Sequence, residues 1–318
     1  MINQRALVTG GAGFIGSNLV DALLDRGDHV TVLDDLSTGR IENLAGAIER
    51  GATLHKADVV DADAVARAFA AARPSVVYHL AAQIDVRRAV EDPARDARIN
   101  VAGTAAVLEQ ARRAGVARFV LASTGGAIYG DAAVVPTPET EPARPLSPYA
   151  LSKAAAEHYV EYYTLRHGLS GFVLRLANVY GPRQDPRGEA GVIALFCGAA
   201  AEGREVTVYG DGRQTRDFVY VADAVEAFIA AGEHGSGGFC NIGTGRATSV
   251  LDLAQALELP TRFAPARQGE VRRSCLAPAR AAELLGWEPR TTLHAGLAAT
   301  LTSTFAEMAR APGASASS

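Results

Sequence analysis

Short apolar runs alternate with longer amphipathic stretches through the first half of the chain. The apolar runs occupy residues 6–9, 29–33, 76–80, 118–123 and 171–176. Continuous runs of this length are typical of parallel strands that are buried on both faces. The stretches between them, 14–27, 61–73, 100–115 and 149–168, have helical periodicity, and several close with a glycine directly after basic residues. The pattern predicts an α/β fold, a Rossmann-type doubly wound parallel sheet with helices on both faces.

The pattern loosens after about residue 177, where loops rich in proline and glycine separate shorter elements. We expect a main domain of residues 1–176 plus about 211–232, where a long helix over 218–232 packs back onto the sheet. We expect a smaller C-terminal α/β lobe that comprises about residues 177–210 and 233–310. The small polar tail, 311–318, is expected to be disordered.

Composition removes several classes of function. The 318 residues are 48% hydrophobic and 21% charged, as in ordinary globular proteins, and the formal net charge of −4 gives no support to nucleic-acid or acidic-membrane binding. The three cysteines, Cys197, Cys240 and Cys275, are far apart and odd in number, which favours buried thiols in a reducing compartment. The seven histidines form no ligand cluster, so no metal is expected. No signal peptide precedes "RALVTG" and no apolar run is long enough to span a bilayer, so we expect a cytoplasmic protein.

A glycine-rich turn follows the first predicted strand. In "ALVTGGAGFIG" the glycines Gly10, Gly13 and Gly16 have the spacing G-x-x-G-x-x-G and lead into a helix. This is a variant of the dinucleotide fingerprint, in which glycines let the backbone approach a pyrophosphate at a helix N-terminus. Glycine-rich turns after strands are also common in proteins that bind no nucleotide.

An acidic residue ends the second predicted strand. Asp34 lies eighteen residues beyond Gly16, where a carboxylate accepts hydrogen bonds from ribose hydroxyls and repels a 2′-phosphate. The combination therefore favours NAD over NADP. Asp58, at the end of a further strand expected between the runs 29–33 and 76–80, either meets the adenine amino group or caps the next helix.

A tyrosine and a lysine lie one helical turn apart in "SPYALSK". The chain has 9 tyrosines and only two lysines, Lys56 and Lys153, so random placement would give one Tyr-x-x-x-Lys pair in about one such sequence in twenty. Pro148 suits the first turn of a helix, which places Tyr149 and Lys153 on one face. A nearby ammonium group favours the phenolate, so Tyr149 can act as a base. Thr124, at the end of the predicted strand 118–123, can hold a substrate alcohol.

These motifs together resemble the extended short-chain dehydrogenase/reductase family, and within it the bacterial UDP-glucose 4-epimerase group. The resemblance covers about residues 1–310 and rests on "TGGAGFIG", "DDLSTG", "HLAAQ", "ASTGGAIYG", "SPYALSK", "RLANVYGPRQDP" and "GDGRQTRDFVYVAD". It implies an isomerase with tightly bound NAD that inverts C4 of a UDP-sugar through a transient 4-keto sugar. It also implies an NAD-binding main domain, a UDP-sugar-binding smaller lobe and a homodimer.

The resemblance also assigns roles to individual positions. It implies that Tyr149 is the general base, Thr124 its hydroxyl partner and Lys153 the ribose-binding lysine that lowers the pKa of the phenol. The implied cofactor contacts are Gly10, Gly13, Phe14, Ile15, Gly16, Asp34, Asp35, Leu36, Ser37, Thr38, Gly39, Asp58, Val59, Leu80, Ala81, Ala82, Asn100, Tyr149 and Lys153. The implied substrate contacts are Ser123, Thr124, Tyr149, Asn178 and the diphosphate-binding arginines Arg216 and Arg272.

Two departures bear on the reaction. Gly125 and Gly126 stand where related dehydratases and decarboxylases have acidic residues, so no evident acid protonates a leaving C6 hydroxyl. Thr124 lies one residue further from Tyr129 than in many epimerases, so Ser123 is an alternative hydroxyl partner.

A UDP-glucuronate 4-epimerase is an alternative function, for which Arg183 and Arg187 offer cations near C6. A nucleotide-sugar dehydrogenase and a non-catalytic NAD-binding protein are less favoured.

Overall fold

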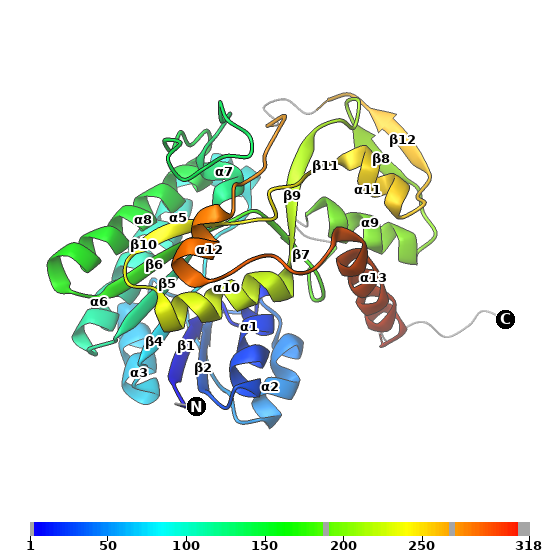
Figure 1. Cartoon of the computed structure of the whole chain (residues 1–318). Helices are drawn as coiled ribbons and strands as arrows, with labels where there is room; N and C mark the ends of the chain where they lie inside the picture. The colour runs from blue at the N-terminus through cyan, green and yellow to red at the C-terminus, as the bar shows by residue number, and fades with distance from the viewer. Residues whose placement is uncertain (1–2, 187–190, 267–270, 311–318) are drawn as a thin grey trace.

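A seven-stranded sheet, parallel throughout, forms the centre of the computed structural model, which describes residues 3–186, 191–266 and 271–310 (Figure 1). Its strand order is β10-β6-β5-β4-β1-β2-β3. The strands are β1 (Arg5–Thr9), β2 (His29–Asp34), β3 (Thr53–Lys56), β4 (Val76–His79), β5 (Arg118–Thr124), β6 (Ser170–Leu176) and β10 (Gly238–Ile242). The chain reverses direction across the sheet between β1 and β4, and such a switch point leaves a crevice at the carboxyl ends of the strands.

Helices cover both faces of this sheet. One core cluster joins α1 (Phe14–Asp25), α2 (Ala45–Glu49), α10 (Val221–His234) and α12 (Ala279–Leu285) to one face. The other cluster joins α3 (Ala62–Ala72), α6 (Thr104–Arg113) and α8 (Pro148–His167) to the opposite face. The remaining short elements around the sheet are η1 (Ile41–Leu44), α4 (Val86–Glu91), α5 (Pro93–Ala97), the π-helical segment η2 (Arg98–Gly103) and α7 (Gly125–Ile128). The predicted doubly wound α/β fold is thereby confirmed.

A smaller lobe lies at the upper right of Figure 1. It contains a three-stranded sheet in the order β11-β9-β7 and a two-stranded sheet of β12 and β8. The elements are β7 (Asn178–Tyr180), α9 (Val192–Ala201), β8 (Val206–Tyr209), β9 (Thr215–Tyr220), β11 (Ala247–Ser249), α11 (Val250–Ala256), β12 (Thr261–Ala264) and α13 (Leu293–Arg310). Phe196, Val208, Leu253 and Leu297 belong to its own buried core.

The lobes interleave more than the sequence pattern indicates. Residues 215–220 form β9 in the smaller sheet, so the helix expected over 218–232 begins only at Val221. Strand β10 pairs with β6 at the edge of the main sheet, although the sequence pattern places residues 233–310 in the smaller lobe. Its run "GFCNI" is short and includes a polar Asn241, which pattern alone does not distinguish from a loop. Residues 311–318, expected to be disordered, lie outside the described residues.

The three cysteine thiols are free and buried, as expected. None of the helices in the described ranges combines the length and the apolar character that crossing a bilayer needs.

Candidate active site

The glycine turn between β1 and α1 is packed against the loop that follows β4. Gly10 has φ of +70°, and a Cβ at this position would lie 2.6 Å from the backbone nitrogen of Ala81. A side chain at Gly16 would collide with the carbonyl oxygen of Gly10. Glycine is therefore required at both positions for α1 to begin directly against the turn. Gly13 is the N-cap residue of α1 and has no side chain to cap it, so N–H groups of the first turn remain available to an anion.

Asp34 connects the glycine turn to the end of β2. Its Oδ2 accepts a hydrogen bond from the Ala12 N–H at 2.9 Å, and its Oδ1 accepts one from the Leu36 N–H at 2.9 Å. Burial raises the pKa of the Asp34 carboxyl, and the two N–H groups oppose that shift. Each carboxylate oxygen has a second lone pair, so Asp34 can still accept from ribose hydroxyls.

Asn100 holds the loop after β4 in place. Its Oδ1 accepts from the Gln83 N–H at 2.9 Å, and its Nδ2 donates to the Gln83 carbonyl oxygen at 2.9 Å. The Leu80 N–H donates to the Thr9 carbonyl oxygen at 3.0 Å, which ties this loop to the end of β1. Asn100 is 1% exposed, so its buried amide fixes the backbone of this loop through both hydrogen bonds.

The structure brings the predicted cofactor residues to one edge of the sheet. Phe14 and Ile15 open α1, Asp35 to Gly39 follow β2, Asp58 and Val59 follow β3, and Leu80 to Ala82 follow β4. Asp58 does not cap α3, because the N-cap is Asp61, whose carboxylate accepts from the Ala64 N–H at 3.0 Å. Asp58 Oδ1 instead accepts from the Val60 N–H at 3.1 Å, so the helix-cap alternative is wrong.

Tyr149 and Lys153 lie on the first turns of α8. Ser147 caps this helix by accepting from the Ala150 N–H at 3.2 Å, and Pro148 occupies its first turn as predicted. Lys153 is 4% exposed, and burial lowers the pKa of its ammonium to about 8 while the carboxylates Glu157 and Asp96 oppose that shift. The lysine therefore remains predominantly protonated at neutral pH.

The pKa of the Tyr149 phenol does not follow the expectation from sequence. Burial raises it to about 12, the negative charge of Asp96 adds to the rise, and a hydrogen bond with Thr124 lowers it. The ammonium of Lys153 therefore does not by itself bring the phenol below its ordinary pKa in this chain. A further positive charge in the crevice is needed before Tyr149 becomes a strong base near neutral pH.

Ser123 and Thr124 at the end of β5 point to different partners. The Ser123 hydroxyl donates to Glu157 Oε1 at 2.5 Å and is 4% exposed. Thr124 is the hydroxyl that hydrogen-bonds the Tyr149 phenol. This separation favours Thr124, rather than Ser123, as the hydroxyl partner of the tyrosine.

Glu157 belongs to a buried polar network that the sequence analysis missed. Arg175 donates to both oxygens of Glu157, with Nη2 at 2.6 Å from Oε2. Its Nη1 donates to the Tyr129 hydroxyl at 2.9 Å, and that hydroxyl donates to Asn241 Oδ1 at 2.8 Å. The signal that would have revealed Glu157 is its spacing, because it follows Lys153 by four residues just as Lys153 follows Tyr149.

Asn178 lies beside α7, and the two predicted diphosphate-binding arginines lie on neighbouring segments. Asn178 opens β7, and a Cβ on Gly126 would lie 3.5 Å from its Oδ1. Arg216 is on β9, and the Thr215 N–H beside it donates to the Arg272 carbonyl oxygen at 3.0 Å, so the two arginines come from adjoining segments. Arg272 Nη2 contacts Asp211 Oδ2 at 2.7 Å and is largely exposed.

Of the two arginines considered for a sugar carboxylate, the structure describes only Arg183. Arg183 Nη2 contacts Asp21 Oδ2 on α1 at 2.6 Å, so its charge is already paired within the chain. Arg187 lies outside the described residues. Among the residues that the structure describes, no group of three or more His, Cys, Asp and Glu side chains is arranged to hold a metal ion.

Comparison with known proteins finds similarity over nearly the whole chain. Residues 6–243 match the model of the NAD dependent epimerase/dehydratase family. The chain is 48% identical to UDP-glucose 4-epimerase of Mycolicibacterium smegmatis over 306 residues, which are 94% of this chain and 97% of that protein. The solved UDP-glucose 4-epimerase of Thermotoga maritima with UDP-glucose has a TM-score of 0.92 at 46% identity, covering 95% of this chain and 99% of that one.

A second solved structure contains the cofactor. The UDP-glucose 4-epimerase of Thermus thermophilus in complex with NAD has a TM-score of 0.87 at 43% identity, covering 94% of this chain and 98% of that one. With the family model matching most of its length, the chain belongs to the NAD dependent epimerase/dehydratase family.

Proposed function

We propose that this protein is an NAD-dependent UDP-hexose 4-epimerase that interconverts UDP-glucose and UDP-galactose. The observation that carries the proposal is the convergence of Thr124, Tyr149 and Lys153 at the carboxyl edge of the sheet that holds the glycine turn and Asp34. The similarity to three proteins named UDP-glucose 4-epimerase extends over 94% or more of the chain, including both lobes. The fold alone would not justify the assignment, because this architecture supports many chemistries.

The residues at the crevice fit a dinucleotide. The glycine turn leaves no room for side chains at Gly10 and Gly16, and the start of α1 offers free N–H groups for a pyrophosphate. Asp34 would accept from the adenosine ribose, and Lys153 and Tyr149 would lie beside the nicotinamide ribose. When bound, NAD would accept a hydride from C4 of the sugar, return it in the second half of the reaction, and add a positive charge to the site while oxidised.

The proton chemistry belongs to the chain itself. Tyr149 removes the proton of the sugar C4 hydroxyl during oxidation and returns it during reduction, while Thr124 holds that hydroxyl in position. Lys153 carries its ammonium one turn further along α8 on the same helical face as Tyr149, and the added positive charge of a bound oxidised cofactor would favour the phenolate that burial disfavours. Asn178 and the arginines Arg216 and Arg272 would hold the rest of the UDP-sugar while the 4-keto sugar turns over.

The two glycines after Thr124 favour epimerisation over elimination. A side chain at Gly125 would collide with Leu276, so no carboxyl group can be accommodated at this position without repacking. Gly126 lies beside Asn178 and, as a glycine, carries no acidic side chain. Protonation of a leaving C6 hydroxyl therefore has no donor at these positions, and the 4-keto sugar is reduced again.

The neutral hexose is favoured over the uronate. A C6 carboxylate needs an available cation or several donors, and Arg183 Nη2 is engaged by Asp21, which leaves only the buried Nη1 of that arginine without a partner. A nuclear magnetic resonance assay of purified protein with UDP-glucose, UDP-galactose, UDP-glucuronate and UDP-N-acetylglucosamine, each without added NAD, tests the proposal. We expect interconversion of the neutral pair. Turnover of the uronate alone, or consumption of added NAD in step with product, would overturn it.

We also propose that the protein is a homodimer and that it is cytoplasmic. The first follows from the family resemblance and the exposed face of α8, and the second from the cysteines. Helix α8 exposes Leu151, Tyr162 and Leu165 along one face, and such an apolar stripe suits pairing with a second copy as a homodimer. The oligomeric mass of a Leu165→Arg variant checks this, since a monomer is expected. The three free thiols are consistent with a cytoplasmic location, where thiols stay reduced.

A further inference from the structure

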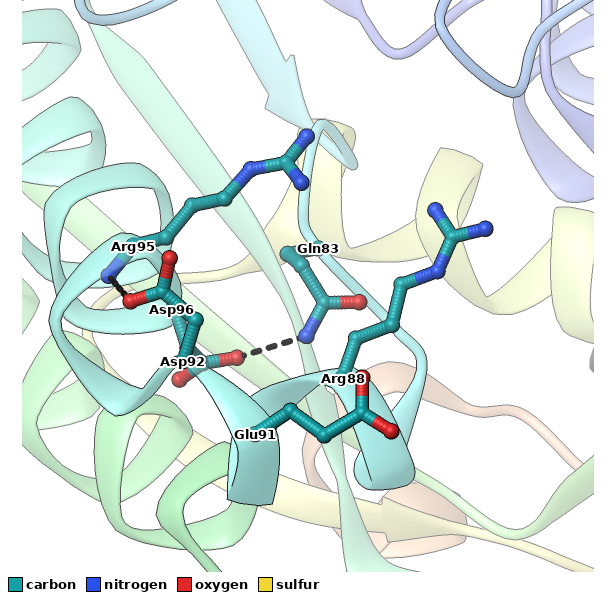
Figure 2. Close-up of a pocket in the computed structure, with 6 residues that line it drawn as sticks. All are labelled: Gln83, Arg88, Glu91, Asp92, Arg95 and Asp96. Atoms are coloured by element: carbon teal, nitrogen blue, oxygen red, sulfur yellow. Dashed lines mark hydrogen bonds between the residues drawn. The ribbon is translucent and has the colours of Figure 1, made fainter.

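Asp96 on α5 is a buried carboxylate to which the proposed reaction gives no role. It is 1% exposed, and its Oδ1 accepts from Gln83 Nε2 at 2.9 Å and from Asn100 Nδ2 at 3.0 Å. Figure 2 draws the first of these hydrogen bonds as a dashed line between Gln83 and Asp96. The other oxygen, Oδ2, has no hydrogen-bond partner among the described residues, so the two amides supply the hydrogen bonds that this carboxylate accepts there.

The nearest arginines around this carboxylate do not replace the amides. Arg88 and Arg95 line the same cavity of about 200 Å³, but both are exposed and their guanidinium groups extend away from the Asp96 carboxylate (Figure 2). Asp96 is therefore held by neutral donors, and hydrogen bonds to an ionised acceptor are stronger than those between neutral groups.

Each of the two amides also makes two hydrogen bonds to the backbone of the loop after β4. Asn100 Oδ1 accepts from the Gln83 N–H at 2.9 Å, and Asn100 Nδ2 donates to the Gln83 carbonyl oxygen at 2.9 Å. The Gln83 side chain bonds Asp85 in the same way, because its Oε1 accepts from the Asp85 N–H at 2.5 Å and its Nε2 donates to the Asp85 carbonyl oxygen at 2.9 Å. Both N–H bonds of each amide are thus used, one on the loop backbone and one on Asp96.

Asp96 determines the orientation of both amides. A carboxylate only accepts hydrogen bonds, so each amide must present its nitrogen to Asp96 and its oxygen to a backbone N–H. If either amide were reversed, its oxygen would face the carboxylate and its N–H groups would face the N–H of Gln83 or Asp85. Without the Asp96 acceptor this preference is lost, and one N–H of each amide has no partner.

The loop that these amides fix is packed against the glycine turn. The Leu80 N–H donates to the Thr9 carbonyl oxygen at 3.0 Å, and the Ala81 N–H donates to Thr9 Oγ1 at 3.2 Å, so the start of the loop is anchored to β1. A Cβ on Gly10 would lie 2.6 Å from the Ala81 nitrogen, which shows how closely the loop and the turn approach each other. The network at Asp96 anchors the other end of the loop, at residues 83 and 85.

We propose that Asp96 is a positioning residue for the dinucleotide: through Gln83 and Asn100 it fixes the loop after β4 and thereby strengthens cofactor binding. Fixing a loop before binding raises affinity, because the loop loses less conformational freedom when the ligand arrives. Neither Asp96 nor Gln83 is among the cofactor contacts expected from the sequence. The consequence for turnover rests on the proposed epimerase function, whereas the anchoring of the loop does not.

Hydrogen exchange tests the anchoring without any cofactor. Asp96→Leu removes the acceptor, and we expect the backbone amides of Gln83 and Asp85 in cofactor-stripped protein to exchange about tenfold faster or more. The amides of β5 should keep their parent rates. Glu91→Leu is the matched control, since Glu91 is exposed and lines the same cavity. Parent-like exchange of both amides in Asp96→Leu, or an equal rise in Glu91→Leu, overturns the proposal.

The dissociation constant of NAD tests the consequence for binding. Asp96→Leu should raise it about tenfold or more, the order of effect of a lost hydrogen bond to a charged group. Asp96→Asn should raise it less, because the side-chain carbonyl of asparagine can still accept from both amides. Calorimetric titration of the cofactor-stripped proteins with NAD measures the three values. Parent-like affinity in Asp96→Leu, or Asp96→Asn as weak as Asp96→Leu, contradicts the proposal.

Gln83→Leu covers the case in which Asp96→Leu does not fold. It removes the amide between Asp96 and Asp85, so the Asp85 N–H should exchange faster and NAD should bind more weakly. In Gln83→Leu/Asp96→Asn, the second substitution should weaken NAD binding by a smaller factor than it does alone, because one of the two amides through which Asp96 acts is gone. Independent, strictly additive effects of the two substitutions would refute this route.

Epimerase kinetics separate this proposal from the proposed function. With NAD added well above its new dissociation constant, kcat of Asp96→Leu should return to the parent value, because Asp96 acts on cofactor binding and not on proton transfer. A kcat that added NAD does not restore overturns the proposal. Weaker NAD binding and faster loop exchange in a protein that inverts no UDP-sugar would retain the positioning role and refute the epimerase function. Parent-like NAD affinity in an active Asp96→Leu variant would do the reverse.

Discussion

The Ser123 hydroxyl donates to Glu157 Oε1 at 2.5 Å, although its neighbour Thr124 is the residue that reaches the Tyr149 phenol. Two adjacent hydroxyls at the end of β5 thus have different partners at different positions along α8. Ser123 joins the buried network beneath the crevice, and Thr124 faces the reaction.

This division predicts opposite phenotypes for two substitutions. Thr124→Val should lower kcat/KM about tenfold or more, since it removes one hydrogen bond to the reacting groups. Ser123→Ala should retain most of the activity and lose about 1–3 kcal/mol of unfolding free energy, because Glu157 loses a buried donor. Steady-state kinetics and urea unfolding of both variants check this. The reverse pattern would make Ser123 the hydroxyl partner.

The pairing of Glu157 with Arg175 predicts strong coupling between them. Arg175→Met leaves a buried carboxylate without its cation and should cost about 3–5 kcal/mol of unfolding free energy. Adding Glu157→Gln to that variant should recover part of the loss, because the uncompensated charge is gone. Urea unfolding of the two single variants and the double variant measures the coupling, and strictly additive losses would show that the pair is not energetically linked.

The Tyr149 phenol should be indispensable for turnover and dispensable for folding. Tyr149→Phe should lower kcat by about 10²–10⁴-fold, the usual contribution of a positioned acid or base. Its thermal midpoint should stay close to that of the parent protein. Tyr159→Phe on the exposed side of the same helix serves as the control and should have parent activity. Activity of Tyr149→Phe near that of the control would remove the proposed base.

Asp34 should set the choice of cofactor. Replacing it by serine removes the charge that repels a 2′-phosphate, so affinity for NAD should fall and the ratio of NADP to NAD affinity should rise. The Ala12 and Leu36 N–H groups lose their carboxylate acceptor as well, so some of the loss comes from a looser glycine turn. Fluorescence titration of cofactor-stripped protein with each dinucleotide measures the ratio, and an unchanged ratio would place cofactor selection elsewhere.

Sequence patterns located the sheet, its main helices and the placement of Tyr149 and Lys153 because each of these leaves a local signal. Apolar runs identify buried strands, Gly10 and Gly16 identify a tight turn, and Pro148 identifies a helix start. Strand β10 and the boundary of α10 were not located, since a short edge strand with Asn241 resembles a loop.

The interactions beneath the site required the tertiary structure. Arg175 and Glu157 lie 18 residues apart, and Tyr129 and Asn241 lie 112 apart, so no local pattern links them. The raised pKa of Tyr149 could not be predicted from the sequence either, because it depends on burial and on Asp96 from another helix. The diphosphate-binding roles of Arg216 and Arg272 remain predictions that the positions of their segments permit.

Transfer of the C4 hydrogen tests the central claim most directly. Purified protein without added NAD is incubated with UDP-glucose that carries deuterium at C4, and the UDP-galactose formed is examined by nuclear magnetic resonance. The account predicts that deuterium stays at C4 of the inverted sugar, because the hydride that leaves is the one that returns. Inversion with the deuterium exchanged for solvent hydrogen, or no UDP-galactose at all, would contradict it.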